Sequence, residues 1–409
     1  MKSKPTTSQI SKDNLNKRYY IISVHCIDKP GIVSALTSSL ASFNVNIIDI
    51  EQSVMRGIFT MYMLADYSTS GEDDKTINSS LKELSKKKGM SINIEKYSDY
   101  IHGSAPECAK SSILVTVLGR DRPGIVHEFA EKFFKMGINI ERIKMIARQE
   151  IIVVEFLVGA GIIDVGVLRC ELQKSAGRVG MSVIFQNEDA FHRKKKLIVF
   201  DVDSTIISDE IIDEIAKAAG IENDVAKITQ KAMLGEIDFK EALIERVRLL
   251  KGLPVSVLED IADNMKFTEG TIELIEKLKE MRYKIAVISG GFTFFTDRLK
   301  DRLCIDYAFG NELVIKDGII TGDVKEPIVD ARAKRDIMIE IAEREGISHQ
   351  EVIAVGDGAN DQYMISDAGL GIAFNPKAIL KKYADGVITD KNIAEILYCL
   401  GDYRKNLQK

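Results

Sequence analysis

Residues 197–205 read Leu-Ile-Val-Phe-Asp-Val-Asp-Ser-Thr, so that four apolar residues are followed at once by two aspartates. Four further short apolar runs follow later in the chain, at residues 285–288, 352–355, 370–374 and 387–388. Short apolar runs that alternate with helical segments indicate a parallel sheet covered by helices on both faces. We therefore predict an α/β domain with a doubly wound, Rossmann-like parallel sheet, in which ligands bind where the strands end.

Each of the first three apolar runs ends in groups that can bind a phosphate or a cation. They are Asp201 and Asp203 after the first run, Ser289 and Gly290 after the second, and Asp357 and Asn360 after the third. Taken singly, each group could be a helix cap or a turn. Together at one sheet edge, with carboxylates and no nearby histidine or cysteine, they favour Mg²⁺ beside a phosphate. Lys334, which alone would be a surface lysine, precedes a helix expected over 337–341 and adds a positive charge.

Residues 209–268 contain no apolar run of this kind, and their apolar residues recur at helical spacing. Gly220 suits the end of the first helix because glycine readily adopts the left-handed conformation. We predict that this insert forms a helical cap over the edge of the sheet. Beyond it, Asp317-Gly318 between two β-branched runs predicts a β-hairpin.

The N-terminal half contains an internal repeat. Residues 28–33, Asp-Lys-Pro-Gly-Ile-Val, recur as Asp-Arg-Pro-Gly-Ile-Val at 121–126, and Asn-Ile at 46–47 recurs with the same spacing at 139–140. In both copies the periodicity predicts the order strand, helix, strand, strand, helix, strand, which is ferredoxin-like. With the Asp-x-Pro-Gly-Ile turn after its first strand, each copy resembles an ACT domain, a small α+β module that senses amino acids.

The two ACT-like copies are expected to span residues 18–98 and 111–187. The resemblance implies an amino-acid effector, and we expect L-serine at the turns around Gly31 and Gly124, with a purely structural role as the alternative. ACT domains commonly pair through their sheets and helices, so a homodimer is also expected.

The composition of the 409-residue chain argues against several classes of protein. A net charge of −5 argues against nucleic-acid binding, and no apolar run approaches the roughly 20 residues of a membrane span. The five cysteines lie far apart, which favours reduced thiols and a cytoplasmic protein over a disulfide framework. Residues 1–17 are polar, and we expect a disordered tail there.

The polar groups also follow the order of motifs in a known family. Asp-x-Asp-x-Thr from Asp201, Ser-Gly-Gly from Ser289, the later Lys334, and Gly-Asp-x-x-x-Asp from Gly356 resemble the four motifs of the haloacid dehalogenase-like phosphatases. The resemblance covers the catalytic domain expected over residues 197–405.

Within this superfamily, finer matches resemble the phosphoserine phosphatases. The matching residues are Glu210, Met233, Phe239 and Arg246 in the helical insert and Met364 behind the last motif. The resemblance implies hydrolysis of O-phospho-L-serine to L-serine and phosphate, the final step of serine biosynthesis. Residues 375–377, Asn-Pro-Lys, differ from the expected Ala-Lys-Pro, and we expect this difference to affect only a loop.

The resemblance assigns the reaction to two aspartates and a magnesium ion. Asp201 is implied to be the nucleophile that forms a phospho-aspartate, and Asp203 is implied to be the general acid and base. Mg²⁺ is implied to be held by the Asp201 carboxylate, the Asp203 backbone carbonyl and Asp357.

The other matching residues are expected to bind the substrate. They are Ser289, Gly290 and Lys334 for the phosphoryl group, Glu210 for the ammonium group, Arg246 for the carboxylate, Asn360 beside them, and Met233 and Phe239 for an apolar wall. For Met233 and Phe239 the ordinary alternative is packing within the helical core.

Two other functions remain open from the sequence. One is a phosphatase or phosphotransferase for another small phosphate, such as phosphohomoserine or phosphothreonine, because an extra methyl or methylene changes affinity by only about 1–3 kcal/mol. The other is an amino-acid sensor with an idle catalytic core, against which the complete set of charged residues argues.

Overall fold

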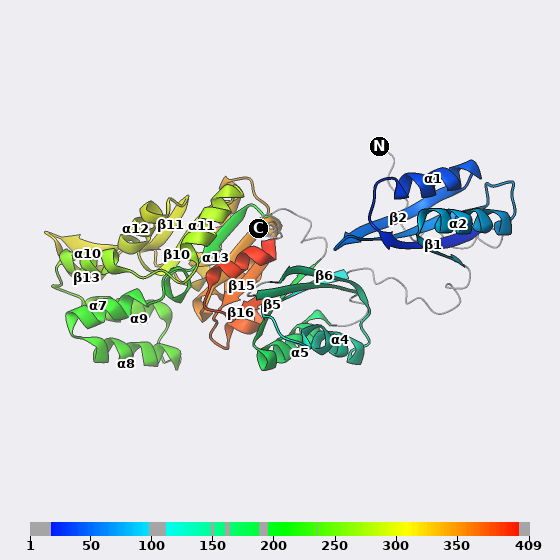
Figure 1. Cartoon of the computed structure of the whole chain (residues 1–409). Helices are drawn as coiled ribbons and strands as arrows, with labels where there is room; N and C mark the ends of the chain where they lie inside the picture. Colours follow the sequence, from blue (N-terminus) through cyan, green and yellow to red (C-terminus); the bar gives the residue numbers. More distant parts are fainter. Residues whose placement is uncertain are drawn as a thin grey trace. The chain divides into compact units, whose positions relative to one another are not determined.

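The computed structural model describes residues 18–97, 112–148, 151–159, 164–187, 195–234 and 236–400. The tail expected over residues 1–17 lies outside these ranges. The chain forms two compact units, residues 1–108 and 109–409 (Figure 1). None of the described helices is long and apolar enough to cross a membrane. Among the described cysteines, Cys26, Cys170, Cys304 and Cys399 are free thiols.

The first unit has the element order that the sequence predicts. Its elements are β1 (Tyr19–Ile27), α1 (Ile32–Ser42), β2 (Asn46–Met55), β3 (Ile58–Asp66), α2 (Asp74–Lys88) and β4 (Ser91–Lys96). The antiparallel sheet has the order β2-β3-β1-β4. Helix α2 begins at Asp74, where the Asp73 carboxylate caps it by accepting the Thr76 N–H at 2.7 Å.

The second copy repeats this order in the second unit. Its elements are β5 (Ser112–Arg120), α4 (Ile125–Lys135), β6 (Ile140–Arg148), β7 (Ile151–Gly159), α5 (Val165–Val179) and β8 (Met181–Asn187). Gly31 and Gly124 stand at matching places immediately before α1 and α4, with φ of 91° and 94°. Both turns therefore need the left-handed backbone that glycine adopts without strain.

The predicted parallel sheet is confirmed in the rest of the second unit. Its strands are β9 (Leu197–Phe200), β10 (Lys284–Phe292), β11 (Tyr307–Asn311), β14 (Val352–Gly356), β15 (Leu370–Phe374) and β16 (Gly386–Ile388). They pair in parallel in the order β11-β10-β9-β14-β15-β16. Strand β11 was not predicted, because it is half-buried at the sheet edge and has no apolar run.

Both faces of this sheet are buried, which explains why its strands are continuously apolar. In β9, Ile198 and Phe200 pack into one apolar cluster, while Leu197 and Val199 pack into the cluster on the other face. The covering helices of the sheet are α11 (Thr271–Glu280), α12 (Thr293–Leu303), α13 (Ala331–Arg344) and α14 (Gln362–Asp367).

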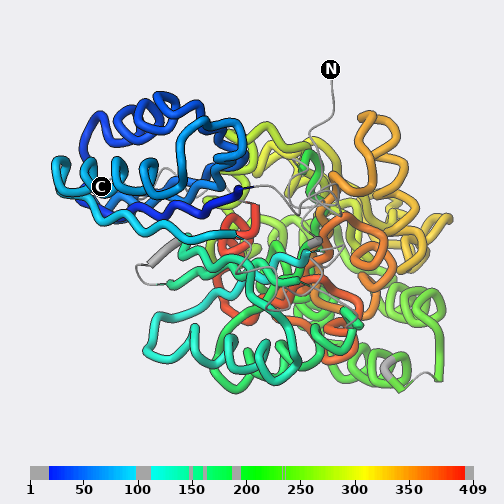
Figure 2. The backbone as a smooth tube through the Cα atoms, turned by 90° about the vertical axis from the view of Figure 1, so that its right-hand side faces the viewer, coloured from blue at the N-terminus to red at the C-terminus, as the bar shows by residue number. Residues whose placement is uncertain are grey.

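The second copy and the parallel sheet share hydrogen bonds. Strand β16 pairs antiparallel with β8, so that a single ten-stranded sheet runs from β11 to β6. In Figure 2 the orange-red end of the chain lies beside the green-cyan strands of the second copy. Gly386 permits this junction, since a Cβ there would lie 2.5 Å from Cγ1 of Ile184. The expected boundary between 111–187 and 197–405 thus falls inside one compact unit.

The described part of the predicted helical insert contains four helices. They are α7 (Ile211–Ala219), α8 (Glu222–Met233), α9 (Phe239–Leu249) and α10 (Val255–Asn264). Gly220 ends α7 in the left-handed conformation, as predicted. The predicted hairpin is also present, formed by β12 (Leu313–Lys316) and β13 (Ile319–Val324), and its Ile320 carbonyl accepts the N–H of Gly252, in the connection after α9, at 2.9 Å.

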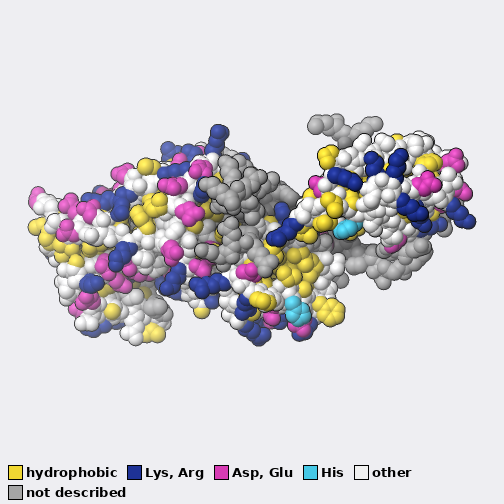
Figure 3. Space-filling model, in the orientation of Figure 1, with side chains coloured by type: hydrophobic (Ala, Val, Ile, Leu, Met, Phe, Trp, Pro, Cys, Tyr) yellow, Lys and Arg dark blue, Asp and Glu magenta, His cyan; other side chains and the backbone are white. Residues whose placement is uncertain are grey.

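The surface of the second unit mixes acidic and basic side chains. On the face shown in Figure 3, Lys and Arg are interspersed with Asp and Glu over the helices of this unit.

Candidate active site

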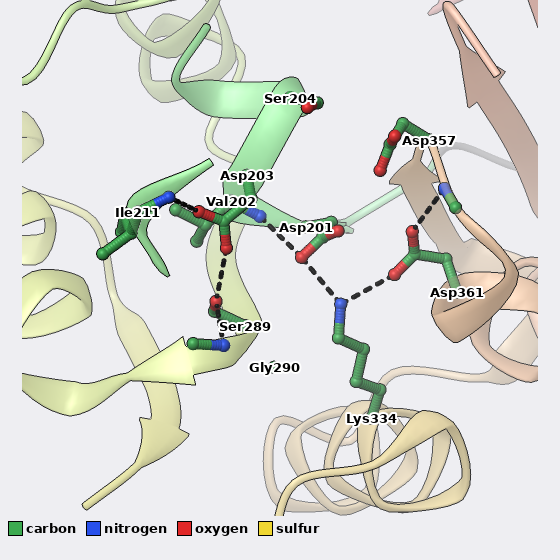
Figure 4. Close-up of polar contacts among 12 residues, drawn as sticks. Asp201, Val202, Asp203, Ser204, Ile211, Ser289, Gly290, Lys334, Asp357 and Asp361 are labelled. Atoms are coloured by element: carbon green, nitrogen blue, oxygen red, sulfur yellow. Dashed lines mark hydrogen bonds and ion pairs between the residues drawn. The ribbon is translucent and has the colours of Figure 1, made fainter. Parts of the chain in front are cut away.

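Asp201 occupies the end of the central strand of the parallel sheet. The residue is 2% exposed, and its Oδ1 accepts hydrogen bonds from the Val202 N–H at 2.7 Å and from Lys334 Nζ at 2.6 Å. The next residues form a short irregular turn, η2 (Val202–Ile206), in which Ser204 has φ of 55°. This strained turn directs Asp201 and Asp203 to different sides of the chain (Figure 4).

Lys334 lies within helix α13, not ahead of a helix as the sequence suggested. The helix starts early because the Asp330 carboxylate caps it by accepting the N–H groups of Arg332 and Ala333. The Lys334 side chain is fully buried between Asp201 and Asp361, with Nζ–Oδ1 distances of 2.6 and 2.8 Å. Burial alone would lower the pKa of Lys334, but the two carboxylates outweigh it and raise the pKa.

Asp361 is a site residue to which the sequence analysis gave no role. Its Oδ1 accepts from Lys334, and its Oδ2 accepts the Gly358 N–H at 3.1 Å, so it fixes both the lysine and the loop. Gly356 leaves room for it, since a Cβ at Gly356 would lie 2.4 Å from Asp361 Oδ2. The signal was present in the sequence, because Asp361 closes the same glycine-rich motif as Asp357.

Three carboxylates form a cluster that suits a divalent cation. Oxygens of Asp201, Asp357 and Asp361 all lie within 4.8 Å of one another, and all three residues are buried. Burial, followed by the nearby Asp201, raises the pKa of Asp357 to about 6. An all-oxygen donor set fits Mg²⁺. Because both Asp361 oxygens are engaged, Asp201 and Asp357 are the carboxylates best placed to bind an ion.

The Asp203 carboxylate points away from this cluster (Figure 4). Its Oδ1 accepts the Ile211 N–H at 2.9 Å, and its Oδ2 accepts the Ser289 hydroxyl at 3.2 Å. Burial is the largest cause of its raised pKa of about 7, followed by Asp201 and Glu210. A carboxyl group with such a pKa can both hold and release a proton near neutral pH.

Ser289 and Gly290 lie near the end of β10, beside Asp203. Ser289 Oγ accepts the Gly291 N–H at 2.8 Å, and the Gly290 carbonyl accepts a bond from Asn311 Nδ2 at 2.8 Å. Phe239 from the cap lies over Gly290, because a Cβ on this glycine would come within 3.0 Å of the Phe239 ring. The cap and the sheet edge therefore meet at this glycine.

A cavity of about 770 Å³ lies between the cap and the sheet edge. The residues predicted from sequence that line it are Asp201, Asp203, Glu210, Phe239, Arg246, Gly290, Asp357 and Asn360. Ser289 and Lys334 contact Asp203 and Asp201 from the sheet side. The side chain of Met233 lies outside the described residues.

The cap contributes two acids, Glu210 and Asp213, and the basic residue Arg246 to the cavity. Glu210 accepts a long hydrogen bond from Ser204 Oγ at 3.4 Å, and Arg246 Nε donates to the Ala242 carbonyl of its own helix at 3.2 Å. Arg246 makes no ion pair with any residue that the structure describes, although Asp213 and Glu210 lie close enough to oppose the lowering of its pKa by burial. A half-buried guanidinium that faces a cavity without a paired carboxylate is suited to bind an acidic ligand.

The expectation that residues 375–377 affect only a loop is wrong. Lys377 lines the cavity, and its Nζ lies 3.5 Å from Asp357 Oδ2 and 3.6 Å from Glu210 Oε1. The signal was again available, because Lys377 follows the apolar run of β15 and so lies at the same sheet edge as the other site residues.

The contacts of Lys334 lead to a prediction about stability. Lys334→Met is expected to lower the free energy of unfolding by about 3–5 kcal/mol, because it leaves two carboxylates buried without their partner. Arg335→Met is the matched control on the same helix, since Arg335 is paired at the surface with Asp336 and Asp367. It should cost about 0–1 kcal/mol. Urea unfolding curves measure both, and equal losses would contradict the structural importance of the buried pairs.

The chain is similar to known proteins over most of its length. Residues 195–369 match a family model for haloacid dehalogenase-like hydrolases, and residues 18–95 match an ACT domain model. The chain is 47% identical over 353 residues to the phosphoserine phosphatase of Archaeoglobus fulgidus, covering 86% of this chain and 100% of that one. It is 35% identical over 389 residues to the phosphoserine phosphatase SerB2 of Mycobacterium tuberculosis, covering 95% and 94%.

A solved structure is similar over most of the same region. The unliganded probable phosphoserine phosphatase from Vibrio cholerae is 32% identical, with a TM-score of 0.56. The match covers 72% of this chain and 88% of that one.

Proposed function

The chain belongs to the phosphoserine phosphatases of the haloacid dehalogenase-like hydrolases, and we propose that it hydrolyses O-phospho-L-serine to L-serine and phosphate, the final step of serine biosynthesis. The main support for this proposal is the set of residues that line one cavity. The nucleophile candidate Asp201 lies at its sheet edge, and Glu210 and Arg246, which has no ion pair among the described residues, lie at its cap. These groups match the phosphate, ammonium and carboxylate of phosphoserine.

Asp201 and Asp203 divide the chemistry between them. A carboxylate oxygen of Asp201 attacks phosphorus, and the bond from phosphorus to the serine oxygen breaks as Asp203 gives that oxygen a proton. In the second step water attacks the phospho-aspartate, Asp203 takes the proton from the water, and Asp201 leaves. The raised pKa of Asp203, about 7, supports this double role because the group holds a proton for the first step and accepts one in the second.

The phosphoryl charge is proposed to be shared among fixed donors. Lys334 already lies 2.6 Å from Asp201 Oδ1, so its charge is beside the oxygen that reacts or its neighbour. Ser289 and the backbone around Gly290 add donors at the end of β10. Since these groups are held by the fold before the substrate arrives, they stabilise the transition state without a cost for reorganisation.

Mg²⁺ is proposed as the cofactor, held by Asp201, Asp357 and the backbone carbonyl of Asp203. The buried, acid-rich cluster supports this choice. When bound, the ion would offset the repulsion between the Asp201 carboxylate and the phosphoryl oxygens.

Recognition of the amino-acid part is assigned to the cap. Glu210 binds the substrate ammonium group and Arg246 binds its carboxylate through two parallel N–H donors. Phe239, which lies over Gly290, forms an apolar wall of the cavity, with Met233 proposed beside it, and Asn360 also lines the cavity.

Truncating Arg246 tests this assignment. Arg246→Ala is expected to cost about 2–5 kcal/mol of transition-state stabilisation with phosphoserine, because the substrate carboxylate loses its buried partner. This loss corresponds to a fall in kcat/KM of at least about thirtyfold. Hydrolysis of p-nitrophenyl phosphate, which has no such carboxylate, should fall much less. Arg248→Ala on the same helix is the control, since Arg248 is exposed outside the cavity. Steady-state kinetics with both substrates measure the difference.

Two outcomes would change the conclusion. Equal losses on the two substrates would mean that Arg246 supports the phosphate site or the fold. A screen of phosphomonoesters in which phosphohomoserine or phosphothreonine is hydrolysed better than phosphoserine would assign a different substrate, and no hydrolysis at all would leave an amino-acid sensor.

L-serine is proposed as the effector of the ACT-like copies. The turns at Gly31 and Gly124 support it, because a Cβ at either glycine would meet no atom of the described residues within 4 Å. Calorimetric titration of L-serine into Asp201→Asn protein should show sites that disappear in Gly31→Val or Gly124→Val protein. Unchanged binding in both variants would make the copies structural. The homodimer stays a prediction, which light scattering of the purified protein tests.

A further inference from the structure

Lys377 is held at the active site by its backbone and not by its side chain. It lies in the connection between β15 and β16, where its N–H donates to the Asp357 carbonyl at 3.0 Å. Two residues earlier, Asn375 is bonded to the neighbouring segment through Ile388 and Asp390. The Lys377 side chain itself is 55% exposed. The loop therefore fixes where the side chain begins, while the ammonium group can move into solvent.

The ammonium group is shared between two acids. Its distances of 3.5 Å to Asp357 and 3.6 Å to Glu210 are longer than a good charged hydrogen bond. Lys334, by contrast, is fully buried with distances of 2.6 and 2.8 Å to its two carboxylates. One lysine of the cavity is thus fixed, and the other is loosely paired.

In the proposed function, each of the two acids that pair with Lys377 binds another cation. Asp357 is a proposed ligand of Mg²⁺, and Glu210 is the proposed partner of the substrate ammonium group. Once these cations bind, a third positive charge between the two carboxylates is repelled by both. Its exposure gives Lys377 a direct route out.

We propose that Lys377 is a displaceable counter-ion that neutralises Glu210 and Asp357 in the empty site and leaves both when the metal and the substrate bind. The inference rests on the proposed function. It makes Lys377 a positioning residue that holds the two acids in place before loading and weakens the binding of each cation by competing with it.

Binding of Mg²⁺ alone tests the proposal. Titration calorimetry of full-length Lys377→Met protein should give a Kd for Mg²⁺ that is about three- to tenfold lower than in the unmodified protein, the effect of removing one nearby charge from a partly exposed site. Lys377→Arg should restore the original Kd, because it keeps the charge. Lys381→Met, an exposed lysine of the same loop that does not line the cavity, should have no effect. The difference between Lys377→Met and the unmodified protein should shrink in high salt.

A second measurement links the binding of Mg²⁺ to the activity of the enzyme. The Mg²⁺ concentration that gives half-maximal activity should fall in Lys377→Met protein by the same factor as Kd. An unchanged or higher Kd for Mg²⁺ in this variant would overturn the proposal. If the unmodified protein does not hydrolyse phosphoserine, the proposed function fails, but the Mg²⁺ titration still decides the role of Lys377.

Discussion

Asp201→Asn protein is expected to lose at least about 10⁴-fold in kcat for phosphoserine, because the amide has nearly the same shape as the carboxylate but is a very poor nucleophile. In the described part of the site, neither Asp203 nor the other carboxylates of the cluster are placed to replace Asp201 as the nucleophile. Asp203 points toward Ser289 and Ile211, and both oxygens of Asp361 are engaged by Lys334 and Gly358. The remaining carboxylate of the cluster, Asp357, is proposed to bind the metal.

The location of the phosphoryl group gives the most direct check. Acid quench of the unmodified enzyme during turnover, followed by peptide mass spectrometry, should find the phosphate on Asp201. Asp209→Asn is a suitable control, since Asp209 is exposed nearby and should keep full activity. Phosphate found on a serine, or turnover retained in the Asp201→Asn variant, would refute the mechanism. Urea unfolding of the variant separates loss of chemistry from loss of fold.

Removal of the metal is expected to have the second large effect. Dialysis against a chelator should lower kcat by about a hundredfold or more, because the ion supplies several kcal/mol of charge stabilisation at the phosphoryl group. The three clustered carboxylates with one fixed lysine are the reason to expect this dependence.

Restoration by different ions makes the metal prediction specific. Mg²⁺ should restore activity, whereas Ca²⁺ should restore little because it prefers more ligands and longer bonds than this compact cluster offers. Asp357→Asn should raise the Mg²⁺ concentration needed for half-maximal activity. Full activity in metal-free buffer would contradict the assignment of Asp357 as a ligand.

The sequence predicted those parts of the fold that depend on which face of an element is buried. The apolar runs of β9, β10 and β14 marked the parallel sheet because both of its faces are covered, and the absence of such runs over 209–268 marked the cap. Most site residues were predicted for the same reason, since parallel strands bring their carboxyl ends to one edge.

The parts that were missed depend on partners distant in sequence. The pairing of β8 with β16 uses backbone hydrogen bonds, which any sequence can make, so no side-chain pattern announced it. The interpretation of Lys377 rested on the difference between residues 375–377 and the expected Ala-Lys-Pro, and it did not use the position of Lys377 after β15. Its contacts with Asp357 and Glu210 arise only when loops from three parts of the chain meet.

Because they share one sheet, the second ACT-like copy and the catalytic half are expected to stay associated even when the chain between them is cut. Leu118, Val153 and Ile184 of the copy pack in the same apolar cluster as Ile388 and Ile396 of the catalytic half. Arg169 adds an ion pair with Asp385 at 2.9 Å. A protease cut between residues 187 and 195 should therefore leave two fragments that stay together through gel filtration. A fragment that begins at residue 195, made alone, would carry an unpaired strand edge at β16 and would be prone to aggregate.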